Sequence, residues 1–486
     1  MSRNLTLALL IGLIFAHVVL AANYAAVTPY RQAGALLGLG KPQKVKDIGA
    51  PDERQHVNYI RHLLDGEGFP VFEPNDKNLY ETYQSHQPPA FYVLGAMWCK
   101  VLGASNLEEK DAGLRLRALN VILGAGTVAG VFFLAFWGFR NSEVALGAAS
   151  FAAFLPMFTA LSGAVSNDPL LILLCTWVLA VTALCLRDGW RYPRIAVIGV
   201  LTGLALLTKT TALALVPVLV LAVFLPQEVD PYYEQEESER PIETIEKIYR
   251  SKKKMPALKM MLVAAAIALC MVTPWWVRNQ QLYHDPFAIT AFNSAFKGSA
   301  QKSDIVAGIA AMNPDGSSEL TYWKDWVGWW TARSFFGVFG YMDIWMNERG
   351  TSFTGVSQAG AAPNTLYRLL LAVTVLCLLG WLIALTKDHW KETRPIQIMN
   401  AAFFLVVLLL FLRFNMQYFQ AQARYLLPAL GPIACAVSVG AWQLLGKYQK
   451  FAFPAIAILF LGVNVFALQK LPDEFSKRIE AGNRLE

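Results

Sequence analysis

The chain has 486 residues, of which 55% are hydrophobic and only 16% are charged. Soluble domains carry about 25% charged residues, so this composition excludes a soluble globular protein and indicates an all-α, polytopic membrane protein. The formal net charge of +7 would favour nucleic-acid binding only if the basic residues gathered on a soluble face. They are instead distributed among the loops between apolar segments, and no nucleic-acid partner is expected.

Runs of apolar residues long enough to cross a hydrocarbon core of about 30 Å recur along the chain. They predict about eleven transmembrane helices, the first of which is interpreted as a retained helix because no clear cleavage pattern follows it. The predicted ranges are 5–27, 113–138, 144–163, 169–187, 194–209, 210–225, 258–276, 366–386, 396–413, 424–445 and 452–470. Whether the apolar stretch 88–103 spans the membrane or lies in the interface stays open at this point.

Lysine and arginine are concentrated in alternate loops, above all in the loop 226–257. By the positive-inside rule, this loop and the amino terminus lie in the cytoplasm. The segments on the other side are then outer loops that carry interfacial amphipathic helices. The predicted organisation is an amino-terminal transmembrane module (1–276) with a catalytic first outer loop (28–112) and a charged cytoplasmic loop (226–257), an aromatic-rich outer loop (277–365), and a carboxy-terminal transmembrane module (366–486).

Two adjacent carboxylates, Asp52 and Glu53, follow the first predicted span. Ionisable groups close to a bilayer are costly and often functional, so the pair is a candidate catalytic site. Pro51 and the two acids suit the start of a helix, and apolar residues at helical spacing follow. His56 lies four residues after Asp52 and shares its face of that helix. The alternative is an ordinary helix start with a surface histidine.

Other polar residues cluster at predicted outer helix ends. The segment 83–89 reads Tyr-Gln-Ser-His-Gln-Pro-Pro and precedes an apolar helix, while Asp168 lies in an Asn-Asp-Pro helix start at the level of Asp52. Cations at outer helix ends either snorkel to headgroups or bind a lipid phosphate. The candidate substrate-binding residues are His56, Tyr83, His86, Gln87, Asp168, Lys209, Arg278, Arg424 and Tyr425.

These motifs occur in an order that resembles one family. They are Pro51-Asp52-Glu53-x-x-His56-x-x-Tyr59, Gln87-Pro88-Pro89, Ser166-Asn167-Asp168, Leu207-Thr208-Lys209, Pro274-Trp275-Trp276-x-Arg278-Asn279 and Arg424-Tyr425-Leu426-Leu427-Pro428. The chain resembles the C-type superfamily of membrane glycosyltransferases, and within it the protein O-mannosyltransferase and lipid A aminoarabinose transferase group. The resemblance implies a polyprenyl-phosphate sugar donor and maps the catalytic acid to Asp52. Gln87 departs from the pattern, because relatives often carry a lysine there.

The predicted function is transfer of a sugar from a polyprenyl-phosphate donor to a glycan, lipid or protein acceptor of the cell envelope. A carboxylate general base and preplaced cations would serve an inverting displacement. The predicted location is the bacterial inner (plasma) membrane, with the active site on its outer face and membrane lipids as further partners. No cofactor beyond the lipid-linked donor is assigned, and a divalent metal stays open. The alternatives are a transporter or flippase of lipid-linked glycans, and a noncatalytic protein that binds isoprenoid lipids.

Overall fold

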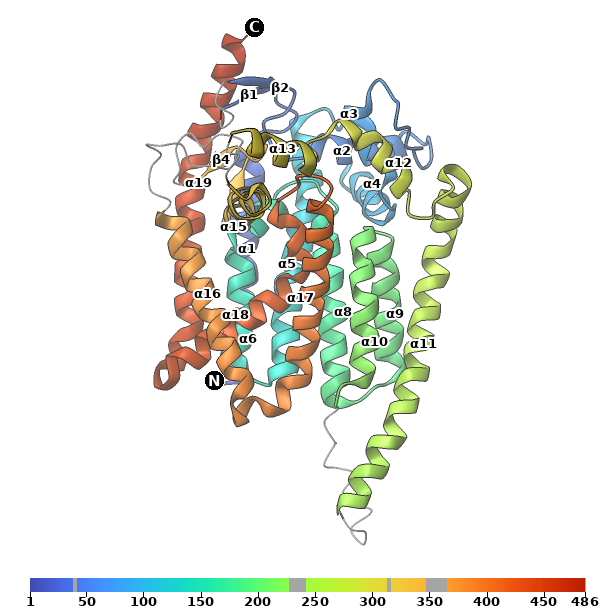
Figure 1. Ribbon diagram of the computed structural model, residues 1–486, viewed down its shortest axis with the longest axis vertical. Helices are drawn as coiled ribbons and strands as arrows, with labels where there is room; N and C mark the ends of the chain where they lie inside the picture. Colours follow the sequence, from blue (N-terminus) through green and yellow to red (C-terminus); the bar gives the residue numbers. More distant parts are fainter. Residues whose placement is uncertain (38–41, 227–241, 313–315, 347–364, 486) are drawn as a thin grey trace.

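A computed structural model describes residues 1–37, 42–226, 242–312, 316–346 and 365–485, without the side chains of 242–256. Of the predicted charged loop 226–257, residues 227–241 lie outside the described residues, and residues 242–257 form the beginning of helix α11 (Ile242–Tyr283) instead of a loop. The chain is 79% helical and 3% strand, which confirms the all-α fold class. Long helices run side by side and form a bundle (Figure 1). They are α1 (Arg3–Val27), α5 (Lys110–Phe139), α8 (Asp168–Asp188), α11 (Ile242–Tyr283), α16 (Thr365–Thr386), α17 (Arg394–Asn415), α18 (Leu430–Leu445) and α19 (Ala452–Arg484).

Shorter helices complete the bundle. The helices α6 (Ser142–Phe154) and α7 (Pro156–Ser162) are bent by 62°, because Pro156 has no N–H to continue the helical ladder. After α8 the chain forms α9 (Tyr192–Leu206), the 3-10 helix η2 (Thr210–Ala214) and α10 (Leu215–Phe224). The helix α5 packs against α1, α6 and α8 and makes the centre of the bundle.

The predicted total of about eleven spans is not confirmed. Among the described residues, seven helices are long and apolar enough to cross a membrane, or eight if the bent pair α6 and α7 counts as one span. The predicted ranges 194–209 and 210–225 coincide with α9 and α10, which have 15 and 10 residues. At about 1.5 Å per residue, neither reaches the thickness of the hydrocarbon core. The stretch 88–103 forms α4 (Ala90–Leu102), whose 13 residues are also too few.

Short elements form a layer over one end of the bundle, the same end at which the carboxy terminus lies (Figure 1). Two antiparallel pairs of strands join the layer, with Gly34 opposite Val45 and Val338 opposite Trp345. The elements are β1 (Gly34–Leu36), β2 (Gln43–Val45), α2 (Glu53–Leu64), α3 (Leu79–Thr82), η1 (Tyr83–His86), α4, α12 (Ile289–Ala295), η4 (Phe296–Gly298), α13 (Lys302–Met312), α14 (Ser318–Thr321), the π-helix η5 (Tyr322–Gly328), α15 (Trp329–Phe336), β3 (Val338–Phe339) and β4 (Ile344–Trp345). The 3-10 helices η6 (Asp388–Thr393), η7 (Ala423–Ala429) and η8 (Gly446–Phe451) precede α17, α18 and α19.

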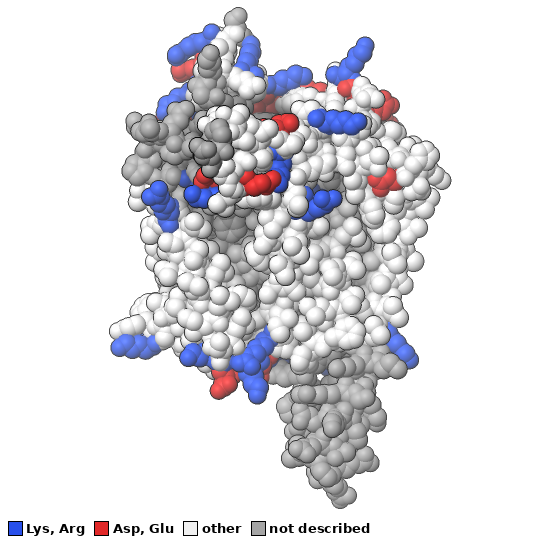
Figure 2. All heavy atoms as spheres, in the orientation of Figure 1, with Lys and Arg blue, Asp and Glu red and all other residues white. Residues whose placement is uncertain are grey.

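Charged side chains gather towards the two ends of the visible face, with a broad uncharged band between them (Figure 2). Such a band is what a protein embedded in a bilayer presents to the lipid. The layer of short elements and the cavity beneath it therefore lie at one membrane surface.

Candidate functional site

A cavity of about 1180 Å³ lies between the layer of short elements and the bundle. One wall is polar, with residues from the region of α2 and η1 and from the ends of bundle helices beneath them: Asp52, His56, Tyr83, Gln84, His86, Gln87, Asn167, Asp168, Lys209, Arg424 and Tyr425. Another wall is apolar and comes from α12, η4 and α17: Ile289, Phe292, Ala295, Phe296, Val407, Leu410, Phe411 and Phe414. Nine of the eleven candidate residues from the sequence line this one cavity.

Asp52 precedes α2 and points into the cavity. Its backbone is left-handed, with φ of 65°, a conformation that Asp and Asn tolerate better than most residues. The Arg424 guanidinium donates to Asp52 Oδ2 at 2.5 Å, and the Tyr83 hydroxyl donates to Oδ1. Burial raises the pKa of the Asp52 carboxyl, but Arg424 and Tyr83 outweigh burial and hold it below its ordinary value. Asp52 is therefore ionised at neutral pH.

A second ion pair joins Asp168 to Lys209, with 2.6 Å between Asp168 Oδ1 and Lys209 Nζ. Asp168 begins α8, where Pro169 occupies the first turn, and Lys209 follows the end of α9. The two loops are tied together because Asn167 Nδ2 donates to the Thr208 carbonyl at 3.3 Å. The pattern Asn-Asp-Pro thus starts a helix and also delivers a carboxylate to the cavity.

The two cations approach one aromatic ring. Lys209 Nζ lies 5.4 Å from the centre of the Tyr425 ring, and Arg424 Cζ lies 5.2 Å from the same point. Both cations are also paired with cavity carboxylates. Both cations therefore lie in the same part of the polar wall.

His56 is buried between the two carboxylate pairs and a stack of tyrosines. Its Nδ1 lies 2.9 Å from the Tyr92 hydroxyl, and the Tyr92 ring stacks on Tyr59 with centroids 3.7 Å apart. Burial lowers the pKa of His56 to about 3, although Asp52 and Asp168 oppose the shift. The imidazole is therefore neutral under physiological conditions.

The segment 83–89 forms the edge of the polar wall. His86 Nδ1 is 2.6 Å from the Tyr83 carbonyl, and burial lowers the pKa of His86 to about 4. Gln87 Nε2 lies 3.0 Å from His86 Nε2, and Asn167 donates to Gln87 Oε1 at 3.4 Å. At the position where the family pattern often has a lysine, this chain therefore has a neutral amide that joins η1 to the start of α8.

Two of the predicted residues do not line the cavity. Glu53 forms a buried pair with Arg117, at 2.8 and 2.6 Å, and also accepts from the Val165 N–H at 2.8 Å. Arg278 donates to the carbonyls of Phe69 and Pro70 and lies over the Trp275 ring. Asp52 has a left-handed backbone just before α2, whereas Glu53 is the first residue of the helix. The two side chains therefore project in different directions, with Glu53 towards the bundle and Asp52 towards the cavity.

Sequence reasoning missed Arg117 but predicted that the aromatic segment 323–345 borders the donor cavity. Arg117 lies inside the predicted span 113–138 and is fully buried, and a cation within a span needs a partner, so its position was a usable signal. The turn between β3 and β4 brings Tyr341, Met342 and Asp343 to the cavity.

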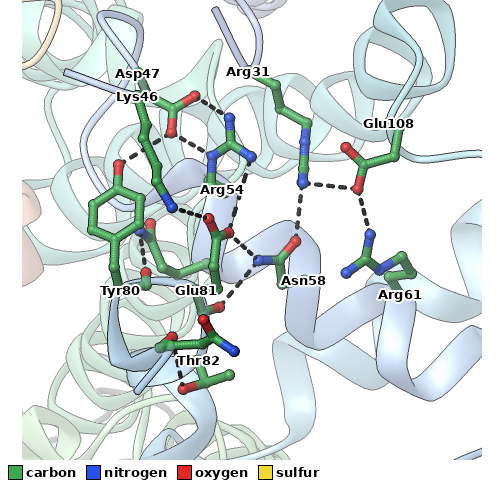
Figure 3. Close-up of polar contacts among 12 residues, drawn as sticks. Arg31, Lys46, Asp47, Arg54, Asn58, Arg61, Tyr80, Glu81, Thr82 and Glu108 are labelled. Carbon is green, nitrogen blue, oxygen red and sulfur yellow. Dashed lines mark hydrogen bonds and ion pairs between the residues drawn. The ribbon is translucent and has the colours of Figure 1, made fainter. Parts of the chain in front are cut away.

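The outer face of α2 is fixed by a polar network (Figure 3). Arg54 donates to both oxygens of Asp47, at 2.5 and 2.9 Å, and Tyr80 donates to the same carboxylate. Further along α2, Asn58 donates to Glu81 at 2.9 Å. These contacts hold α2 against the segment 79–82 and so fix the direction in which Asp52 projects. Among the described residues, no cluster of three or more His, Cys, Asp or Glu side chains is present, so no metal ligands are assigned.

Comparison with known proteins agrees with this architecture. Residues 86–230 match the family model of dolichyl-phosphate-mannose-protein mannosyltransferase. The oligosaccharyltransferase of Archaeoglobus fulgidus, solved with a tethered acceptor peptide, superposes with a TM-score of 0.56 at 12% identity, over 97% of this chain and 55% of that one. The structure of the same archaeal enzyme with an inhibitory peptide and a dolichol-phosphate superposes with a TM-score of 0.51 at 14% identity, over 96% of this chain and 56% of that one. ArnT from Cupriavidus metallidurans bound to undecaprenyl phosphate gives a TM-score of 0.40 at 11% identity, over 94% of this chain and 78% of that one.

The chain spans about half the length of the archaeal enzyme that it matches. No curated protein matches it significantly by sequence. The fold and the cavity define an integral membrane protein whose site lies at one surface of its bundle. Its fold is similar to that of the archaeal oligosaccharyltransferase. The match of residues 86–230 to a mannosyltransferase family model agrees with the resemblance that the motifs predicted.

Proposed function

We propose that the protein transfers a sugar from a polyprenyl-phosphate donor to an acceptor hydroxyl of the cell envelope. The observation that supports this function is the composition of one cavity. Two carboxylates and two cations share its polar wall, and an apolar aromatic wall continues along α17. The structural neighbours are described with a dolichol-phosphate and with an acceptor peptide, which are the two kinds of ligand that such a cavity would hold.

The apolar wall suits the isoprenoid part of the donor. Phe292, Phe296 and Phe414 contribute aromatic rings to it, and Leu410 on α17 is 41% exposed. The wall therefore continues onto the lipid-facing surface of the bundle, from which a membrane-embedded tail can enter. Arg424 and Lys209 are the proposed phosphate ligands, because cations at the end of an apolar groove bind the phosphate while the tail stays in the lipid.

The chemistry follows from this placement. The acceptor oxygen forms a bond to the anomeric carbon while the bond from that carbon to the phosphate oxygen breaks. The acceptor proton passes to Asp52, and the polyprenyl phosphate leaves with its charge stabilised by the two cations. A single displacement of this kind inverts the anomeric centre and needs one base. The acceptor class, glycan, lipid or protein, is not part of the proposal.

The proposed orientation places the cavity on the outer side of the bacterial inner membrane. The basic loop segments 187–194, 387–394 and 446–450 belong to the end of the bundle opposite the cavity, and basic loops stay in the cytoplasm. A polyprenyl-phosphate sugar would then be used where envelope acceptors are found.

The test is transfer by purified protein from a polyprenyl-phosphate sugar, with Asp52→Asn as the variant. Asparagine also tolerates φ of 65° and keeps the shape of the side chain, so the backbone should be unchanged. Loss of the base should lower the rate by about 10²–10⁴-fold, while binding of undecaprenyl phosphate persists. Turnover close to wild type would contradict the catalytic assignment and favour a protein that only binds isoprenoid lipids.

A further inference from the structure

The two ion pairs of the polar wall leave no excess positive charge for the phosphate of the proposed donor. Asp52 with Arg424 and Asp168 with Lys209 add up to zero formal charge, and the side chains of Asp168 and Arg424 are only 6% exposed. A donor phosphate brings a further negative charge to the same wall. Water cannot screen it well in a buried site, so the phosphate must obtain its cations from the carboxylates that already hold them.

The two cations differ in whether they can bind a phosphate and still keep their carboxylate partner. Arg424 uses Nη2 for Asp52, and a guanidinium carries five N–H groups, so it can bind a phosphate and keep Asp52. Lys209 has three N–H groups, but its charge is a single point on a flexible stem, so every anion that it binds must approach the same Nζ. Its Nζ lies 2.6 Å from Asp168 Oδ1, and a phosphate in contact with the same Nζ would place two anions side by side.

We infer that Asp168 and the donor phosphate compete for Lys209, and that donor binding transfers this lysine from the carboxylate to the phosphate. The inference rests on the proposed function. Tyr425 supports it, since Lys209 and Arg424 lie 5.4 and 5.2 Å from the centre of its ring, which places both cations in the same part of the polar wall.

The exchange has a consequence for the order of binding. Without the donor, the Asp168 carboxylate is engaged with Lys209. Once the lysine moves, a buried carboxylate is left near Asp52, since both acids lie within electrostatic reach of His56. A buried carboxylate needs a new hydrogen-bond donor. A second polar group of the acceptor can supply it, because the reacting hydroxyl gives its one proton to Asp52. The donor is therefore expected to bind first and to favour binding of the acceptor.

The experiment is a double-mutant cycle on the binding of undecaprenyl phosphate to the purified full chain, with Asp168→Asn, Lys209→Met and the double variant. Asp168→Asn should tighten binding by about tenfold, the size of one strong coupled contact, because the lysine is no longer held. Lys209→Met should weaken binding. In the Lys209→Met background, Asp168→Asn should tighten binding less, because only the repulsion between Asp168 and the phosphate is relieved and no lysine is left to release.

The same tightening by Asp168→Asn in both backgrounds would overturn the inference, since it would reflect general repulsion between Asp168 and the phosphate. No tightening in the wild-type background would also overturn it. Undecaprenol, which lacks the phosphate, is the control ligand and should bind all four proteins equally. Failure of the wild type to bind undecaprenyl phosphate in preference to undecaprenol would refute the proposed donor, which is a separate result. Asp168→Ser serves as a second neutral variant if the asparagine variant does not fold.

Discussion

Replacement of Glu53 by glutamine should destabilise the protein without removing a catalytic group. Glu53 accepts from Arg117 Nε at 2.8 Å, from Arg117 Nη2 at 2.6 Å and from the Val165 N–H at 2.8 Å. The side chain of Arg117 is 0% exposed and that of Glu53 is 5% exposed. Glutamine keeps one acceptor oxygen, but its NH₂ group faces a cationic donor, and Arg117 becomes a buried charge without a counterion.

The expected magnitude follows from that geometry. Breaking one side of a buried ion pair costs about 3–5 kcal/mol. Arg117 also donates to the carbonyls of Ala25, Thr28 and Pro29, so the guanidinium stays in place and its charge cannot move to water. These contacts join the end of α1 to α5, and their weakening should lower the temperature at which the protein unfolds in detergent.

The assay is the fraction of protein that stays monodisperse in size-exclusion chromatography after heating. Glu67→Gln is the matched control, because Glu67 is a 60% exposed carboxylate in the same outer segment and its loss should cost less than about 1 kcal/mol. After correction for folded protein, Glu53→Gln should retain transfer from the lipid-linked donor. A Glu53→Gln variant with wild-type thermal stability and no sugar transfer would refute this reasoning and indicate that Glu53 takes part in catalysis.

Three further predictions address the cavity and its orientation. Arg424→Ala should weaken binding of undecaprenyl phosphate by about 1.5–3 kcal/mol through loss of a charge-assisted bond, whereas Arg278→Ala should bind normally because its guanidinium contacts carbonyls outside the cavity; equal losses would contradict the assignment. His56 has a pKa of about 3 when folded and 6.5 ordinarily, so the unfolded chain binds one more proton below pH 6.5 and stability falls as the pH drops. His56 accounts for about 2 kcal/mol of the unfolding free energy that is lost between pH 8 and pH 5. In the His56→Gln variant, the loss of stability measured by thermal unfolding over this pH range should be smaller by this amount. Cysteines introduced at Asn75 and Lys447, which are both exposed, should react from opposite sides of the membrane, and labelling from the same side would contradict the proposed topology.

The sequence by itself determined the class of protein and the approximate bounds of several long helices. Apolar runs must become helices in lipid, because backbone groups there can pair only within their own segment. For this reason the predicted ranges 5–27 and 366–386 agree closely with α1 and α16. The candidate residues were recognisable because polar groups at helix ends near a bilayer are costly unless they are used. Hydropathy could not fix the number of spans, because α9 and α10 are apolar but short.

Only the tertiary structure decided which candidates belong together. Asp52 and Arg424 are separated by 372 positions, and no local pattern specifies that they form an ion pair. The choice between Asp52 and Glu53 depended on the direction of α2, which the contacts of Arg54 with Asp47 and of Asn58 with Glu81 fix from the outside. Arg278 carries the same charge as Arg424 at a similar helix end but meets backbone carbonyls instead of a carboxylate. Charge and spacing are properties of the chain, whereas the partner of a buried charge depends on which helices pack around it.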